Sequence, residues 1–334
     1  MSLRTKTGAV AALAVAAALA LSACTSTPAP KTEPTDGSST APAADAPTIR
    51  IGQLNSYTTL TISKDLGLAT ALPGGSAEIA WSTGFPAFVP ALEAVNAGEI
   101  DVSSGGGTNF FTGLAAGGDY LAIGIENGSA GVSSGIVASE GSGIKTIEDL
   151  KGHTIAVNQG GTGHYLALRA LDKAGIDPSE VTLEFLPPAD GIAAFQSGAV
   201  DAIAIWDQYF ATAQLQPGSV VVATGEDLDS LNIVFHFVTR SFYEEHPEAV
   251  AAFIRALSDV SAQTAANPQL VLDFYKQLGA GDDVLEIIAQ WPPYTFQPIG
   301  QAQIDLLTQH GEDLLRYGLI TEIPDISDAF VVTE

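Results

Sequence analysis

The chain has 334 residues, of which 46% are hydrophobic and 15% charged, and 13 Lys and Arg stand against 38 Asp and Glu, a formal charge of −25. This composition excludes an intrinsically disordered chain, and it argues against a nucleic-acid partner because phosphate binding needs clustered Lys and Arg. One cysteine excludes an intrachain disulfide, and at roughly 150 residues per domain the length favours two domains.

Residues 1–23 are predicted to form a bacterial lipoprotein signal peptide. Arg4 and Lys6 precede an apolar run, Ala9 to Leu21, that is too short to span a bilayer of about 30 Å as a helix. The run ends in Leu21-Ser22-Ala23-Cys24, which resembles the lipobox in which the cysteine becomes lipidated. We therefore expect Cys24 to anchor the protein in the lipid bilayer, because two acyl chains hold stably. An ordinary signal peptide is the alternative.

Residues 24–47 are rich in Ser, Thr, Pro, Ala and Asp and contain almost no large apolar side chain. Such a segment cannot bury a core, so we predict a disordered tether. The globular body is then extracytoplasmic, at the outer face of the bacterial cytoplasmic membrane. This location disfavours enzymes that depend on NAD, ATP or coenzyme A, and lipidation of Cys24 excludes a catalytic cysteine.

The body alternates predicted strands and helices. Apolar alternation and short buried runs predict strands at 48–52, 78–81, 100–103, 120–125, 135–139, 154–157, 181–186, 202–206 and 233–239. Helices are predicted at 86–97, 163–174 and 190–196, the last capped by Asp190, and through most of the chain after Pro247. This order predicts an α/β fold with mostly parallel sheets.

Two segments a hundred residues apart have a similar sequence pattern. Asn96–Asp101 and Gln196–Asp201 each join a helix end, a glycine and a strand start. Two lobes of similar architecture would produce this echo, and so would the stereotyped junction between any helix and strand.

The segment from Thr154 to Tyr165 has the order strand, glycine-rich turn, helix start. Free N–H groups and the dipole at a helix start favour an anion, and glycine lets the ligand approach the backbone. Gly161, Thr162, Gly163 and His164 are therefore candidates for binding a sulfonate or phosphate group. An ordinary turn of an α/β fold is the alternative.

Other polar or glycine-rich residues also follow predicted strands, where α/β folds place their ligands. Trp206 could cover an apolar ligand body, although a tryptophan there could equally anchor the core, and Asp207 could fix a neighbouring helix or donor. The remaining candidates for substrate binding are Asn55, Ser56, Phe85, Gly106, Gly107, Thr108, Asn127, Asp190 and His236.

Rival motifs are weaker. Gly161-x-Gly163 half-matches a dinucleotide fingerprint, but Leu166 occupies the position of the third glycine. The G-x-S-x-G match at residues 131–135 is followed by a predicted strand, whereas a nucleophile elbow needs a helix there. The five histidines lack zinc-site spacing, so we expect neither a metal nor a cofactor.

Several segments together resemble the sulfonate-binding proteins of ABC importers, whose wider family includes binders of taurine, nitrate and thiamine precursors. The matching segments are Phe85-Pro86, Asn96–Asp101, Ile147–Gly152, Gly161–Leu171, Leu186–Asp190, Ile205–Asp207, His246–Val250 and Tyr317–Ile320. The resemblance implies a two-lobed, type II periplasmic-binding-protein fold with two crossovers and a ligand cleft between the lobes. Carried over, Thr162, Gly163 and His164 hold the anionic head, Asp190 caps a helix, and Trp206 with Asp207 line the pocket.

The resemblance also sets the expected domains and function. Lobe 1 would comprise 48–138 and 240–334, and lobe 2 would comprise 139–239, with hinges near Gly135–Ser139 and His236–Arg240. The predicted function is non-catalytic binding of a small organic anion, most simply an alkanesulfonate, for delivery to ABC permease subunits. Many relatives have Asp in the turn where Gly105–Asn109 stands, and Pro where Gln208 stands, and no Lys or Arg falls in the predicted cleft loops. Nitrate, taurine, a thiamine-pyrimidine precursor, a non-anionic solute, an enzyme on the same fold and a purely structural lipoprotein are the alternatives.

Overall fold

The computed structural model describes residues 46–127, 131–230 and 233–333. The chain divides into Met1–Ser39 and Thr40–Glu334, and every described residue lies in the second unit. The predicted signal peptide, Cys24 and nearly all of the predicted tether lie outside the described residues. Within the described ranges, no helix is both long and apolar enough to cross a membrane.

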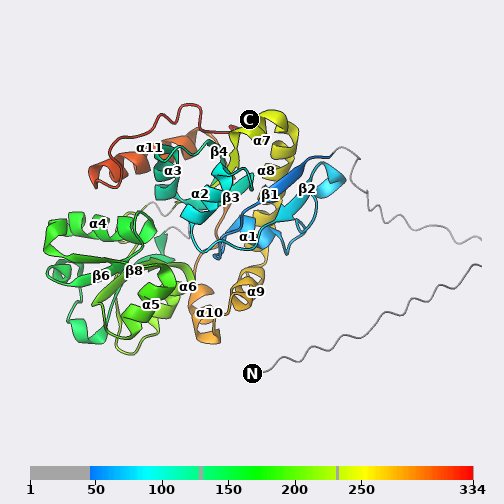
Figure 1. Cartoon of the computed structure of the whole chain (residues 1–334). Coiled ribbons are helices and arrows are strands. Elements are labelled where there is room, and N and C mark those ends of the chain that lie inside the picture. The colour runs from blue at the N-terminus through cyan, green and yellow to red at the C-terminus, as the bar shows by residue number, and fades with distance from the viewer. Residues whose placement is uncertain (1–45, 128–130, 231–232, 334) are drawn as a thin grey trace, which may run out of the picture. The chain divides into compact units, whose positions relative to one another are not determined.

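Two separate β-sheets organise the described chain (Figure 1). The first sheet has six strands, in which β1 pairs in parallel with β2 and β3, and β10 runs antiparallel to β3 and β4. In spatial order its strands are β11 (Phe296–Pro298), β4 (Tyr120–Asn127), β10 (Ile233–Thr239), β3 (Val102–Gly106), β1 (Thr48–Ile51) and β2 (Glu78–Trp81).

The second sheet has five strands, in which β6 pairs in parallel with β7 and β8, and β5 runs antiparallel to β8 and β9. Its spatial order is β7 (Thr182–Phe185), β6 (Thr154–Val157), β8 (Ala202–Trp206), β5 (Ser134–Ala138) and β9 (Val220–Thr224). The α/β class is confirmed, but both sheets are mixed and not mostly parallel. The reason is that β5 and β10 each follow a passage of the chain from one sheet to the other and run against their neighbours.

The two passages between the sheets also correct the predicted lobe boundaries. The prediction placed β5 with the first lobe and β10 with the second, and it put hinges inside these strands. In the structure β5 belongs to the second sheet and β10 to the first, so the passages lie between β4 and β5 and between β9 and β10. The composition of a buried strand does not say which sheet it joins, and this is why the sequence misplaced both boundaries.

Helices cover both sheets (Figure 1). Those packed with the first sheet are α1 (Thr59–Ser63), α2 (Phe88–Asn96), α3 (Gly107–Ala115), α7 (Arg240–Glu245), α8 (Pro247–Ala266) and α11 (Gln301–Arg316). Those packed with the second sheet are α4 (Thr162–Ala174), α5 (Pro188–Gln196) and α6 (Asp207–Gln214). A further apolar cluster joins α1, α6 and α8 to α9 (Gln269–Gln277) and α10 (Asp282–Ile288). Short 3₁₀ turns lie at Pro73–Gly75, Glu140–Ser142, Ile147–Leu150 and Pro178–Glu180.

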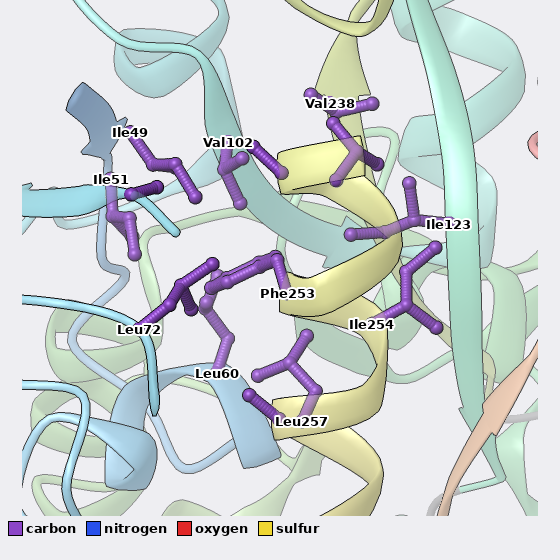
Figure 2. Packing of buried hydrophobic residues seen from close by; sticks show 14 of the residues in the cluster. Ile49, Ile51, Leu60, Leu72, Val102, Ile123, Val238, Phe253, Ile254 and Leu257 are labelled. Carbon is purple, nitrogen blue, oxygen red and sulfur yellow. The ribbon is translucent and has the colours of Figure 1, made fainter. Parts of the chain in front are cut away.

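The long helix α8 supplies one face of the core of the first sheet. Phe253, Ile254 and Leu257 share one side of this helix and are almost completely buried. Figure 2 shows them packed against side chains of β1, β3, β4 and β10. Full burial of such a side chain contributes about 1.5–3 kcal/mol, so this contact is a main reason why the C-terminal part of the chain stays with the first sheet.

One predicted cap is wrong. Helix α5 begins at Pro188 with Pro187 as its N-cap, and Asp190 lies exposed in the first turn without capping the helix. Proline is favoured at the first helical position because its φ is already helical and it has no N–H to satisfy. The two prolines therefore set the start of α5 before Asp190 is reached.

Candidate ligand-binding site

Two helices from different sheets begin beside each other. Helix α3 follows β3 with Gly106 as N-cap, and α4 follows β6 with Gly161 as N-cap. A Cβ atom placed on Gly106 would lie 3.1 Å from Thr162 Oγ1, so the two helix starts are in contact. The first-turn N–H groups of a helix have no partner within the helix and carry the positive end of its dipole. The positive ends of two helix dipoles therefore lie next to each other.

The turn before α4 is built by glycine and one asparagine. Gly160 has φ +64°, a left-handed conformation that glycine adopts without strain. Asn158 Oδ1 accepts a hydrogen bond from Gly163 N–H at 2.8 Å, and a Cβ on Gly163 would lie 2.2 Å from the carbonyl oxygen of Ala204. Only glycine lets α4 begin this close to β8. Asn158 was not predicted as a site residue, although an Asn between a buried strand and two glycines is a usable signal.

His164 lies in the first turn of α4. Its Nδ1 accepts a hydrogen bond from Gly160 N–H at 3.2 Å, and its ring lies edge-on to Phe185 with centroids 5.1 Å apart. Burial lowers the pKa of His164 below its ordinary value, so the imidazole is neutral at pH 7. Phe185 is not among the predicted site residues, and it keeps 45% of its surface exposed.

The start of α3 packs against α11. Asn109 Oδ1 accepts from Gly106 N–H at 3.2 Å, and Thr108 Oγ1 lies 3.4 Å from Nε2 of His310. Burial, with the positive charge of Arg169, lowers the pKa of His310 to about 3, so this imidazole is neutral. Gly107 is also pressed against His310, since a Cβ there would meet the ring at 3.0 Å. Thr108 and Gly107 are thus buried supports of the helix start.

The loops after β1 and β2 run together. Asn55 N–H donates to Phe85 O at 3.0 Å, and Phe85 N–H donates to Gln53 O at 2.8 Å. The Asn55 side chain is exposed, while Phe85 is half-buried against the core that α2 and α3 share. Ser56 is half-buried, and its carbonyl accepts a hydrogen bond from Thr61. These loops follow the carboxyl ends of parallel strands, as does the start of α3 after the neighbouring β3.

Trp206 and Asp207 have different surroundings. Trp206 ends β8 and is half-buried, and together with Asn158, Leu186 and Pro188 it lines a small pocket over the second sheet. Asp207 is buried instead, and its Oδ1 accepts a hydrogen bond from the Tyr275 hydroxyl of α9. The structure therefore places Trp206 at the site, whereas Asp207 lies in the interior behind it.

Three predicted residues do not join this group. Asn127 is exposed at the end of β4, opposite Ile233, and Asp190 is exposed on α5. His236 is completely buried in the first sheet, where its Nε2 lies 2.6 Å from Glu126 Oε1. Glu126 Oε1 also accepts from Thr59 N–H at 2.8 Å. His236 therefore contacts the core and offers a ligand no exposed surface in this conformation.

The assembled site offers hydrogen-bond donors without a cationic side chain. Neither Lys nor Arg occurs in the described loops and helix starts that form the site, which are 52–58, 82–87, 104–109, 158–164, 185–188 and 206–208. Arg169, two turns further along α4, is paired with Asp313 at 2.9 Å. Within the described chain, no cluster of three or more His, Cys, Asp or Glu could hold a metal ion. Such a site is suited to bind an anion through N–H groups and neutral donors.

The serines of the G-x-S-x-G match are not arranged as a nucleophile. Ser134 begins strand β5, and Ser133 Oγ is 2.8 Å from the hydroxyl of Tyr294. Both serines are buried, and a strand follows them where an elbow would need a helix. The strand predicted to follow this match is confirmed.

Comparison with known proteins identifies a family and named relatives of this chain. Residues 89–270 match the family model described as NMT1/THI5 like. A protein of Escherichia coli (strain K12) named for binding aliphatic sulfonates is 36% identical over 239 residues, which cover 71% of this chain and 74% of that protein. Both observations concern most of the described chain.

Solved structures give the same result. The periplasmic aliphatic sulphonate binding protein SsuA from Escherichia coli matches with a TM-score of 0.74 at 30% identity, over 86% of this chain and 94% of that one. The alkanesulfonate-binding protein SsuA from Xanthomonas axonopodis pv. citri, solved with bound MOPS, matches with a TM-score of 0.77 at 27% identity, over 87% of this chain and 100% of that one. The predicted periplasmic-binding-protein fold is confirmed, and the chain belongs to the NMT1/THI5-like family.

Proposed function

We propose that this protein is the extracytoplasmic solute-binding component of an ABC importer and that it binds a small organic sulfonate. The observation that carries the proposal is the closeness of the starts of α3 and α4, at Gly106 and Thr162, which brings the positive ends of two helix dipoles together. Relatives named for sulfonate binding support it.

The chemistry of the site suits a sulfonate head. A sulfonate carries one negative charge on three oxygen atoms that only accept hydrogen bonds. The helix starts, Thr162 and His164 offer donors to such oxygens, and the helix dipoles favour the negative charge without a Lys or Arg. Phe85, Phe185 and Trp206 offer apolar surface for the organic body.

The ligand would bind between two lobes, each built on one sheet. We place the lobe boundaries at the two passages of the chain, between β4 and β5 and between β9 and β10. A ligand that contacts α3 and α4 together stabilises the closed arrangement and shifts the population toward it. The closed protein would then be recognised by ABC permease subunits. Lipidation of Cys24 would keep it at the membrane surface; mass spectrometry of the isolated protein tests for the two acyl chains.

Thermal unfolding of the Cys24→Ser chain against single ligands tests the binding function. The panel should contain methanesulfonate, butanesulfonate, MOPS, taurine, nitrate, a hydroxymethylpyrimidine and an alkylamine. A ligand at 100 times its Kd adds about 2.7 kcal/mol to the free energy of unfolding, which raises Tm measurably. We expect the sulfonates to raise Tm. A rise with only the pyrimidine or the amine would contradict the proposal.

A matched pair of variants connects binding to α4. Thr162→Pro removes one N–H group at a helix position that tolerates proline, whereas Thr162→Val keeps the N–H and removes only the hydroxyl. Sulfonate affinity should fall more in the proline variant. The role is non-catalytic, so butanesulfonate recovered after prolonged incubation should be chemically unchanged, and a product detected by mass spectrometry would contradict this.

A further inference from the structure

The turn before α4 fixes where the proton of His164 lies. Gly160 N–H can donate only to a nitrogen with a free lone pair, so Nδ1 of His164 carries no proton. A neutral imidazole has one N–H, which must therefore be on Nε2. Nε2 is on the ring edge away from Gly160, so the donor points out of the turn and not into it.

Two contacts keep the ring in this state. Gly160 has φ +64°, which aims its N–H toward the first turn of α4, and Phe185 lies edge-on to the ring at 70°. His164 is half-buried, and this burial disfavours a second proton on the ring. Position, plane and proton of the imidazole are thus determined before a ligand arrives.

We propose that His164 is a specificity-determining residue, which presents one fixed Nε2–H donor to the ligand and so selects head groups that only accept hydrogen bonds. This inference rests on the proposed sulfonate function. A sulfonate carries no proton near neutral pH and fits this donor. A phosphonate of the same length carries either an O–H group, which the fixed donor cannot accept, or a second negative charge, which no Lys or Arg of these loops neutralises.

Nitrogen NMR tests the proton position directly. Imidazole ¹⁵N signals of the Cys24→Ser chain distinguish protonated from unprotonated nitrogen, and the His164 signals are assigned by their loss in His164→Gln. We expect Nδ1 without a proton and Nε2 with one at pH 7 and above. Saturating MOPS should move the Nε2–H signal, while the signals of His246, at the start of α8, stay in place.

The possible results separate the two proposals. An Nδ1–H tautomer, or a charged imidazole at pH 7, overturns the inference whether or not MOPS binds. MOPS that binds and leaves Nε2 unchanged overturns the inference alone. If no sulfonate on the panel binds, the proposed function fails and the selectivity inference fails with it.

Three variants separate donation to the ligand from support of the turn. His164→Gln keeps an acceptor for Gly160 and an N–H donor, whereas His164→Glu keeps the acceptor, favoured in a first helical turn, but has no donor. His164→Leu has neither. Loss of a hydrogen bond to a charged group raises Kd about 10- to 100-fold. We expect an increase of this size in the Kd for butanesulfonate in His164→Leu and at least the same increase in His164→Glu. In His164→Gln the Kd should change little.

The ratio of the Kd values for butylphosphonate and butanesulfonate would not change if His164 only supported the turn. In His164→Gln the side-chain oxygen still accepts from Gly160 N–H and the amide N–H remains as donor, so the preference for butanesulfonate over butylphosphonate should be kept. In His164→Leu no donor remains, so this preference should shrink. An unchanged preference in the Leu variant, or equal sulfonate affinity in the Gln and Leu variants, would overturn the inference.

Discussion

Asp207 is a buried carboxylate in a left-handed backbone conformation, with φ +62°. Tyr275 donates to it, and the backbone N–H groups of Gln208 and Tyr57 also face it. Tyr57 is two residues after Asn55, and Asp207 directly follows Trp206. One carboxylate therefore connects the loop after β1, the end of β8 and helix α9, which explains why an acidic residue is tolerated there.

The first prediction concerns the proton of Asp207. Burial raises the pKa of Asp207 from 3.8 to about 6 in the folded protein. A raised carboxyl pKa contributes stability that is fully present below the unfolded pKa and is lost as pH rises through the folded pKa. The free energy of unfolding of Asp207→Asn minus that of the wild type should therefore increase by about 1–2 kcal/mol from pH 5 to pH 8.

Urea unfolding at several pH values measures this difference. Asparagine also tolerates a positive φ but has one acceptor oxygen fewer, so the slope with pH is the test and not the absolute stability. A difference between the two proteins that stays flat, or that falls as pH rises, would show that Asp207 is ionised throughout this range.

The second prediction compares the effect of adding a methyl group at two glycines, one in α4 and one in α5, the helices that pack on the second sheet. A Cβ on Gly163 would meet the Ala204 carbonyl oxygen at 2.2 Å, whereas a Cβ on Gly191 would meet only the tip of the Ile203 side chain at 3.3 Å. Gly163→Ala should therefore displace the start of α4, cost about 1–3 kcal/mol in unfolding free energy and weaken MOPS binding. Gly191→Ala is the control, and equal calorimetric effects of the two variants would refute the steric argument.

Residues were predictable where their signal is local. Thr162, Gly163 and His164 could be predicted as candidates because a strand, glycines and a helix start are adjacent in the sequence. Asn109, His310 and Phe185 were missed, since His310 lies two hundred residues from Thr108 and its importance comes only from packing. The burial of His236 beside Glu126 could not be predicted for the same reason, since a histidine in a strand gives no local sign of its partner.

At the scale of elements, α4 and α11 run side by side in the same direction. Tyr165 lies against His310, Arg169 pairs with Asp313, and Asp172 pairs with Arg316. Because the partners advance together along both helices, the contact fixes the register of α4. The helix that starts the candidate site is thus held along its length by a helix of the first sheet.

The third prediction tests this contact. Arg169 and Asp313 keep less than a fifth of their side-chain surface exposed, so Asp313→Asn leaves a half-buried cation without its charged partner. We expect a loss of about 1–2 kcal/mol in unfolding free energy, below the cost at a fully buried pair. Asp282→Asn, which breaks the exposed pair with Lys276, should cost under about 0.5 kcal/mol. Equal losses in urea unfolding would contradict the assigned role of the α4–α11 pair.

Elements were predictable according to their length and burial. The long apolar strands of both sheets were located to within a few residues, because buried runs bounded by glycine or proline are unambiguous. Strand β9 has two exposed valines and β11 has three residues, so neither shows a clear period. Helix α6 begins at Asp207 in a conformation unusual for a helix start, which a pattern of side chains does not reveal.

At the scale of the whole described chain, two sheets are joined by two passages, and their helix starts meet at Gly106 and Thr162. The sequence predicted two lobes from an echo and a resemblance, but the strand exchange at β5 and β10 required the pairing partners to be known. Pairing partners are a tertiary property. Local patterns therefore located the strands correctly and assigned two of them to the wrong sheet.

The fourth prediction follows from the contact between the helix starts. Since a Cβ on Gly106 would lie 3.1 Å from Thr162 Oγ1, cysteines at these two positions have Cβ atoms close enough for a disulfide. The Cys24→Ser chain has no other cysteine. Gly106→Cys with Thr162→Cys should crosslink on oxidation, visible as altered mobility on a non-reducing gel. Gly106→Cys with Ser179→Cys, in the 3₁₀ turn before β7, is the control that should not.

The crosslink makes closure itself measurable. If the helix starts close over the ligand, a disulfide formed in the presence of MOPS should retain it through dialysis, and one formed without ligand should exclude it. Reduction should restore exchange in both cases. If MOPS exchanges at the wild-type rate in the oxidised protein, the ligand enters without separation of α3 from α4. The opening that admits the ligand would then have to lie between another pair of elements.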